Sequence, residues 1–178
     1  MKAIRLGVLV LLTVAATFAL HELAHGLTGA ALGYEIFVRA NSSGLAGGGA
    51  YDSDLHRDLV AAAGPAVTLL QGLVAALWIR TRPGLIALGI VLSALFMRIL
   101  AAFASLGNPN DEARLGLSWG VGPWAIHALV ILILLGLAVW SARRVRPRLA
   151  PLIGLLVLIQ IGVAAVALGE RLLPTLTL

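Results

Sequence analysis

Long apolar stretches separated by short polar connections constrain this chain more than any other feature of its sequence. A helix that crosses the hydrocarbon core of a bilayer needs about 20 apolar residues. The sequence predicts five such spans, at 5–32, 56–79, 84–106, 123–142 and 149–169. Composition agrees, because 60% of the residues are hydrophobic and only 12% are charged, whereas soluble domains carry about 25% charged residues. We therefore expect an all-α polytopic membrane protein, with residues 1–178 forming a single membrane-embedded domain.

Charged residues at the ends of the spans predict how the chain crosses the membrane. Alternate connections are basic, with Lys2, Arg5, Arg80, Arg82, Arg143, Arg144, Arg146 and Arg148. The opposite side is acidic, with Glu35, Asp52, Asp54, Asp58, Asp111, Glu112 and Glu170. Because basic loops stay in the cytoplasm, we expect a multi-pass cell-membrane protein with a cytoplasmic N-terminus and an external C-terminus. The predominance of Arg over Lys is typical of a GC-rich bacterial genome.

Composition also limits the partners and the N-terminal processing that we expect. The net charge of +5 is explained by the membrane topology, and no soluble basic face with interleaved aromatic residues indicates nucleic-acid binding. The chain contains no Cys, so a metal would be held by His, Asp or Glu. The first apolar stretch is longer than a signal peptide's and is followed by no clear cleavage site, which predicts an uncleaved first span. The sequence does not indicate an oligomeric state.

The first span contains the motif HExxH, formed by His21, Glu22 and His25. On a helix, residues four apart share one face, so the two imidazoles are spaced to bind a single zinc ion. Glu22 lies beside them and is positioned to take a proton from a water molecule at the metal. Ionisable residues within a membrane span are costly and indicate function. The alternative is that these side chains are satisfied by neighbouring polar groups in a helix bundle.

A catalytic zinc ion usually has three protein ligands, and the third is not fixed by the motif. The predicted topology brings Asp111 and Glu112 to the same side of the membrane as the motif, and Asp111 is our first choice. Asp111 is alternatively a capping or turn residue, and Glu112 is alternatively a partner that orients a ligand. His127 and His56 are further candidates, although an interfacial role for the first and a helix-capping role for the second are the simpler expectations.

Two features of the second and third spans point to a hydrated cavity. Arg98 lies within the third span, where it must pair with Asp111 or Glu112, stabilise an oxyanion, or extend to the interface. Gly64-Pro65 interrupts the second span. The proline frees a backbone carbonyl, which must face protein or water rather than lipid.

The connection after the first span, about 33–55, predicts a short β-hairpin or re-entrant loop. Residues 34–40 are β-branched and aromatic, 41–44 carry a turn signal, and 45–51 form a Gly-rich candidate return strand. A disordered surface loop is the alternative. An ordered hairpin could hold an extended peptide substrate by strand addition. The connection at about 107–122 contains Asn108-Pro109-Asn110, which predicts a turn.

Taken together and in this order, the motifs resemble the site-2 protease family of intramembrane zinc metallopeptidases. The resemblance covers roughly residues 15–115: HELAH in the first span, AAGPAVT at 62–68 in the second, and Asn-Pro-Asn-Asp after the third. It implies zinc ligation by His21, His25 and Asp111, with Glu22 as the general base. It also implies that Gly64 and Pro65 line the active site.

This chain departs from the family pattern in four ways. Thr68 stands where the family usually has an Asn that holds substrate, and the spacing around Asp111 differs from the family's last motif. Studied members of the family face their site towards the cytosol, whereas the charges here place it nearer the non-cytoplasmic face. The sequence also includes no recognisable recruitment domain.

We therefore expect one zinc ion and an endopeptidase that cleaves a membrane-protein or peptide substrate in or near a transmembrane segment. Residues that bind substrate or support the ligands are expected to be Gly64, Pro65, Thr68, Arg98 and Glu112. The alternative is a metal-binding transporter subunit or scaffold that retains the motif without proteolysis. Glu22 separates the two hypotheses, because only the peptidase needs it as a base.

Overall fold

The computed structural model describes residues 2–172 and 174–178, and within them five long helices follow the five apolar stretches. Their bounds are α1 (Lys2–Ala31), α2 (Asp54–Thr81), α3 (Leu85–Ala104), α5 (Ala125–Val145) and α6 (Leu149–Gly169). Each is long and apolar enough to cross a bilayer. The expected all-α polytopic membrane protein is confirmed, and the observed helices differ from the predicted spans by a few residues at most ends.

The long helices surround one apolar core. Its most buried side chains include Val14 of α1, Leu88 of α3, Leu134 of α5 and Ile159 of α6. The outward faces are apolar as well, and Leu132, for example, is 65% exposed. In water such a surface would be unfavourable, whereas a lipid hydrocarbon phase accommodates it. The bundle is therefore built to be covered by a bilayer on its outer faces.

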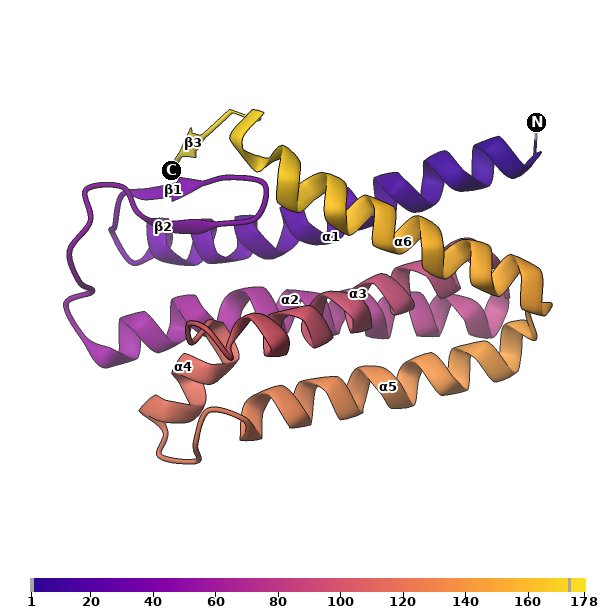
Figure 1. Cartoon of the computed structure of the whole chain (residues 1–178). Coiled ribbons are helices and arrows are strands. Elements are labelled where there is room, and N and C mark those ends of the chain that lie inside the picture. The colour runs from indigo at the N-terminus through magenta and orange to yellow at the C-terminus, as the bar shows by residue number, and fades with distance from the viewer. Residues whose placement is uncertain (1, 173) are drawn as a thin grey trace.

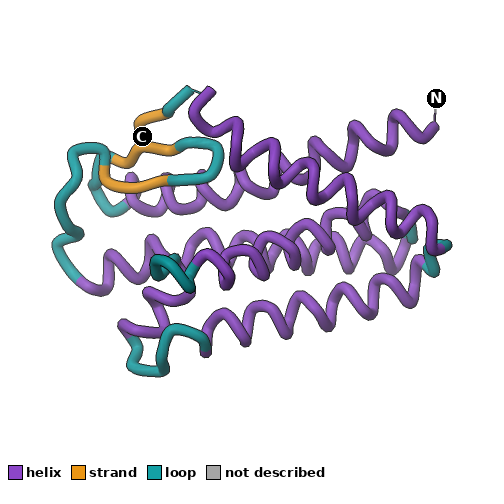
Figure 2. The backbone as a smooth tube through the Cα atoms, viewed as in Figure 1, coloured by secondary structure: helices purple, strands orange, loops and turns teal. Residues whose placement is uncertain are grey.

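The connection after α1 forms an ordered hairpin, which confirms the hairpin hypothesis over the disordered loop. Strand β1 (Ile36–Val38) pairs antiparallel with β2 (Ser43–Leu45), with Phe37 opposite Gly44. The return strand lies earlier than the predicted 45–51, because the Gly-rich stretch forms a turn and an irregular segment instead. Residues 176–177 add a strand, β3 (Leu176–Thr177), to the other edge of β1, giving the order β2-β1-β3. Figure 2 shows this small sheet beside the purple helices.

The sheet packs directly on α1. Ile36 and Val38 are 0% and 4% exposed. Ile36 packs against Gly29 of the helix, and Val38 packs against Gly26. A Cβ at Gly29 would lie 2.7 Å from Ile36 Cδ1, so the strand can approach this closely only because the helix has no side chain there. The hairpin is thus fixed against the helix turn that carries the HExxH motif.

The connection between α3 and α5 contains a short helix, α4 (Asp111–Ser118), where the sequence was expected to form a turn. The turn lies earlier than predicted, at residues 105–107 directly after α3, with a bend at Asn108, and Asn110 is the N-cap residue of α4. Asp111 and Glu112 then occupy the first helical turn, where acidic side chains interact favourably with the helix dipole. Figure 1 shows α4 near the hairpin end of the bundle. The loops joining α2 to α3 and α5 to α6 lie at the opposite end, with the N-terminus.

Candidate metal centre

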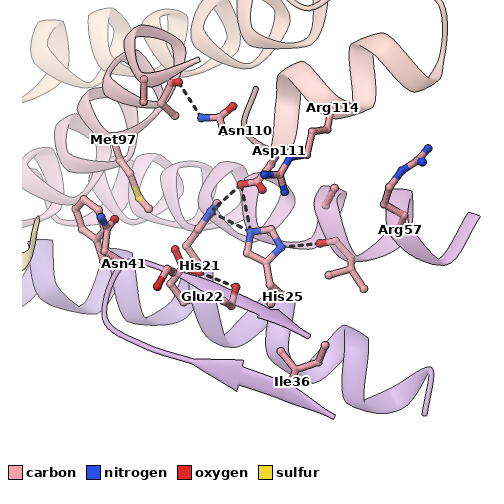
Figure 3. Close-up of a pocket in the computed structure, with 18 of the residues that line it drawn as sticks. His21, Glu22, His25, Ile36, Asn41, Arg57, Met97, Asn110, Asp111 and Arg114 are labelled. Atoms are coloured by element: carbon pink, nitrogen blue, oxygen red, sulfur yellow. Dashed lines mark hydrogen bonds and ion pairs between the residues drawn. The ribbon is translucent and has the colours of Figure 1, made fainter. Parts of the chain in front are cut away.

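Two elements distant in sequence bring three possible metal ligands together at the hairpin end of the bundle. His21 and His25 lie on one face of α1, and Asp111 is the first residue of α4. The two His Nε2 atoms are 3.1 Å apart, and each lies 3.2 Å from Asp111 Oδ2. The three ligand atoms thus form a nearly equilateral triangle, which Figure 3 shows at the centre of the site.

The hydrogen bonds of the imidazoles orient both of them towards this triangle. His25 Nδ1 lies 2.6 Å from the carbonyl oxygen of Val60, and since a carbonyl only accepts, His25 donates from Nδ1. His21 Nδ1 lies 3.1 Å from Thr68 Oγ1, whose own proton goes to the Gly64 carbonyl. His21 therefore also donates from Nδ1. Both neutral rings then direct their Nε2 lone pairs into the space between the three residues, and a hydrogen bond donated from the other ring nitrogen is typical of metal-ligating histidines.

Gly64 explains how α2 can approach the histidines closely enough to orient them. A Cβ at this position would overlap both imidazole rings, at His25 Nε2 and at His21 Cε1. Pro65, the next residue, is also buried within α2. Because proline removes the hydrogen bond to the carbonyl of Ala61, that carbonyl is freed in a residue that lines the site cavity. The expected placement of Gly64 beside the motif is observed, although neither Gly64 nor Pro65 is among the residues that line the cavity.

The carboxyl group of Asp111 is ionised in this surrounding. Burial acts to raise its pKa, whereas hydrogen-bond donors and positive charge on His21 and His25 hold the pKa well below its usual range, so the carboxyl is ionised when a positive charge lies among the three groups. Two imidazole lone pairs and a carboxylate oxygen in close contact require a positive charge among them. The cluster is therefore electrostatically suited to a cation.

The donor set and its spacing fit a zinc ion. Bonds of about 2.0–2.1 Å at tetrahedral angles place two ligand atoms roughly 3.3 Å apart, close to the observed 3.1 and 3.2 Å. Two His and one carboxylate are a donor set of catalytic zinc sites, which keep a fourth position open. Residues His21, His25 and Asp111 would hold the ion.

Glu22 lies beside this cluster and is fixed by the hairpin. Its side chain is 6% exposed, and Ser43 of β2 donates a hydrogen bond of 2.7 Å to its Oε2 atom. Glu22, the two histidines and Asp111 all line one cavity of about 780 Å³. Ser43 lines it too, and sequence reasoning missed this residue because a contact between a serine of a short strand and a helix leaves no periodic signal. Figure 3 shows the short dashed contact next to Glu22.

The cavity is apolar on its bundle side and polar at its rim. Phe18, Met97 and Val163 contribute apolar surface from three helices, whereas Arg114 and Tyr51 line the polar part. Burial raises the pKa of the Tyr51 hydroxyl, so Tyr51 is a neutral hydrogen-bonding group there. Such a cavity has room for an extended peptide segment with both apolar and polar side chains.

Glu112 does not join the ligand cluster, although it is the neighbour of Asp111. It is completely buried, and its Oε1 atom accepts a hydrogen bond of 2.9 Å from Arg98 Nη1. Arg98 is only 2% exposed and therefore does not extend to the interface. The ion pair ties α3 to the first turn of α4, where Asp111 begins. These two residues hold the helix turn that carries Asp111 and do not belong to the cluster themselves.

The two other histidines also lie away from the cluster. His127 is buried at the start of α5, where its Nε2 atom lies 3.0 Å from Ser105 Oγ. His56 lies in the first turn of α2 and contacts the Tyr34 hydroxyl through Nδ1 at 2.8 Å. Thr68 contacts His21 Nδ1 and fixes the orientation of that ring. Among the described residues, Asp111 is the acidic group that the fold brings to both motif histidines.

Comparisons with protein-family models, with curated proteins and with solved structures find no match for this chain. Its class therefore follows from the fold and the site: an all-α polytopic membrane protein with a buried cluster of two His and one Asp next to a buried Glu.

Proposed function

We propose that this protein is an intramembrane zinc metalloendopeptidase that hydrolyses a peptide bond in or near a transmembrane segment of a membrane-protein substrate. The observation that carries the proposal is the triangle of His21 Nε2, His25 Nε2 and Asp111 Oδ2, with Glu22 lining the same cavity. The motif resemblance to the site-2 protease family points in the same direction. A bound zinc ion would polarise the scissile carbonyl and make a water molecule more acidic.

Glu22 has the chemistry and the setting of the general base. Among the described residues, its hydrogen-bond partner is Ser43 on Oε2, so Oε1 remains available to a water molecule in the cavity. Glu22 would take the proton of the attacking water and pass it to the nitrogen of the leaving amine. The hydrogen bond from Ser43 keeps the carboxylate in one orientation between these two transfers. The surrounding apolar residues limit the access of bulk water.

The sheet offers one edge beside the cavity on which a substrate strand can be added. In the observed register, Phe37 and Gly44 are a hydrogen-bonded pair, as the flanking bonds Arg39 N–H to Ser42 O and Ala46 N–H to Glu35 O show. Ser43 therefore points its backbone N–H and C=O away from β1. Since β3 covers the other edge of β1, a substrate would pair with β2, which lines the cavity. Of the two hairpin strands, β2 is therefore the one that we propose pairs with the substrate.

Metal content of the purified protein is the first test. Elemental mass spectrometry should find about one zinc ion per chain in the wild type, and a clear loss in Asp111→Ala. Asp52→Ala is the matched control, because Asp52 is an exposed acidic residue outside the cluster. His21→Ala should lose zinc as well, and His56→Ala is its matched control, because His56 lies outside the cluster. A folded wild-type protein that binds no zinc after zinc is added back would refute the proposal.

Glu22→Gln then separates the peptidase from a metal-binding transporter or scaffold. The amide keeps the size of the side chain but cannot act as a base, so cleavage of a reconstituted transmembrane peptide should stop while zinc stays bound. Removal of a general base typically costs about 10²–10⁴-fold in rate. Cleavage that survives Glu22→Gln at the wild-type rate would exclude the proposed mechanism.

We also propose that the arginine-rich end of the bundle faces the cytoplasm, which places the metal centre nearer the external face. The chain has no Cys, so single cysteines can report on orientation without further changes. Ser118→Cys at the end of α4 should react with an impermeant thiol reagent added outside intact cells, and Thr81→Cys at the end of α2 should not. The reverse labelling pattern would show the opposite orientation.

A further inference from the structure

A groove between α2 and α5 lies at the end of the bundle opposite the metal centre. It has a volume of about 490 Å³ and is lined on α2 by Leu73, Ala76 and Arg80, among others. On α5 it is lined by Leu137, Trp140 and Arg144. Figure 1 shows that the C-terminal ends of α2 and α5 are close to the loops that lie farthest from the hairpin.

The groove changes from apolar to cationic along its length. Residues spaced three, four and seven apart share one helix face, so Leu73, Ala76 and Arg80 form one wall in that order. Leu137, Trp140 and Arg144 repeat the order on the other wall. Seven residues of helix span roughly 10 Å, so the apolar part extends well into the hydrocarbon layer when the arginines lie at headgroup level.

The two arginines at the rim are not neutralised by the protein. Among the residues that the structure describes, neither guanidinium makes a salt bridge or a hydrogen bond with an acidic side chain. Arg144 instead lies over the ring of Trp140, with its Cζ atom 5.7 Å from the ring centroid. This contact orients the guanidinium at the mouth of the groove. Leu73 is 44% exposed and Trp140 is 38% exposed, so the groove is open to a ligand from the membrane.

We propose that this groove binds an anionic phospholipid, with the phosphate between Arg80 and Arg144 and an acyl chain along Leu73, Ala76 and Leu137. Charge and shape support this occupant together. Guanidinium groups bind phosphate oxygens through paired N–H donors, and basic pockets between transmembrane helices bind anionic headgroups. A free anion would use only the rim, whereas a lipid uses the apolar walls as well. The proposal does not depend on the metal centre.

Native mass spectrometry of the full-length protein tests the proposal. Detergent-solubilised protein is mixed with equal amounts of dioleoyl phosphatidylglycerol and dioleoyl phosphatidylcholine, and retained lipid is counted. The wild type should retain phosphatidylglycerol in preference to phosphatidylcholine. Arg80→Gln/Arg144→Gln should reduce that retention on the order of tenfold or more, because each arginine near a membrane surface contributes separately to anionic-lipid binding.

Arg82→Gln/Arg143→Gln is the matched control. It removes the same charge from the same end of the bundle, but neither residue lines the groove. Retention in this control should stay within about twofold of the wild type. An equal loss in both double variants would show general attraction to the basic end and would overturn the proposal, as would a wild type without preference for the anionic lipid.

Two further measurements separate a lipid site from a phosphate site and from misfolding. A dihexanoyl phosphatidylglycerol should bind more weakly than the dioleoyl form, and inorganic phosphate should not displace the long-chain lipid. Equal binding of short and long chains, or displacement by phosphate, would overturn the lipid assignment. Should the double variant fail to fold, Arg144→Gln alone, at an exposed position, gives the same test.

Discussion

Ser43 of the hairpin donates a hydrogen bond of 2.7 Å to Glu22 Oε2 on α1, so one residue connects the edge of the sheet with the carboxylate of the HExxH motif. The backbone of Ser43 points away from β1, towards the edge on which we propose the substrate strand is added. Its side chain points to Glu22. Binding of the proposed substrate strand and orientation of Glu22 would therefore be linked through a single residue.

Ser43→Ala should lower the rate of peptide cleavage by about tenfold or more, because a hydrogen bond to a charged group contributes about 1.5–3 kcal/mol. Zinc content should not change, since Ser43 contacts no ligand atom in the described structure. Ser43→Thr keeps the hydroxyl and should restore most of the rate. The readouts are kcat and KM for a reconstituted transmembrane peptide, with zinc content measured in parallel.

Ser42→Ala is the control for that prediction, because the neighbouring hydroxyl contacts Glu170 and not Glu22. It should leave kcat within about twofold of the wild type. A drop in kcat for Ser42→Ala equal to that for Ser43→Ala would show that the hairpin as a whole is disturbed. The prediction that Ser43 acts specifically by orienting Glu22 would then be refuted.

Gly64→Ala should weaken zinc binding by about 10–100-fold, the usual cost of disturbing the partners that orient metal ligands. The added methyl group would overlap His25 Nε2 and the His21 ring, so the histidines or α2 must move. Intrinsic helix propensity acts in the opposite direction, because Ala is favoured over Gly by up to about 1 kcal/mol. Zinc affinity is measured by competition with a chromogenic chelator.

Gly136→Ala provides the control for the close approach at Gly64. Gly136 also lies within a long helix, but no atom of the described structure is within 4 Å of a Cβ built there. This substitution should leave zinc affinity unchanged and keep or slightly raise the thermal stability. If Gly64→Ala bound zinc as tightly as Gly136→Ala, the proximity of α2 to the histidines would not matter for the site.

Much of the fold was predictable from the sequence because a membrane span is a local property. Apolar runs of sufficient length identify α1, α2, α3, α5 and α6 without knowledge of any contact. The short α4 was not predicted, although a signal for it exists. Asn110 is a favourable N-cap residue and two acidic residues follow it, which together are typical of a helix start. The Asn-Pro-Asn turn signal obscured that pattern.

The candidate site was predictable only where its residues share a helix face or a distinctive motif. His21 and His25 are four residues apart, so their proximity follows from helix geometry. The approach of Asp111 depends on how α4 packs, and the topology indicated only that it lies at the same end. The sequence favoured Asp111 over Glu112 without deciding between them, because the spacing around Asp111 differs from the family's last motif. Ser43 and the Val60 carbonyl meet the motif through tertiary contacts that local patterns do not encode.

The ion pair of Arg98 and Glu112 should be far more costly to break than to replace. Arg98→Met leaves a completely buried carboxylate without its partner, which should lower the free energy of unfolding by about 3–5 kcal/mol. Arg98→Met/Glu112→Leu removes both charges and should recover most of that loss, because replacing a buried pair with apolar residues is often neutral. Denaturation of the detergent-solubilised protein, followed by circular dichroism, measures both effects.

Asp54→Ala is the comparison for the buried pair, since the ion pair of Asp54 with Arg57 is at the surface, where Asp54 is 84% exposed. Such a pair contributes about 0–1 kcal/mol, so this variant should unfold nearly as the wild type does. If the double variant remained as unstable as Arg98→Met, the pair would be required for the packing of α3 against α4 and not only for its own charge balance.

Removal of the metal should lower thermal stability only in proteins that have the complete ligand cluster. A ligand that binds the folded state at 100 times its Kd stabilises it by about 2.7 kcal/mol, and the cluster joins α1 to α4. A chelator should therefore lower the Tm of the wild type and of Glu22→Gln by several degrees, and readdition of zinc should restore it. Asp111→Ala should already melt near the lower temperature, with no further change on chelation. An equal response of Asp111→Ala and the wild type to the chelator would show that the stabilising metal is bound elsewhere.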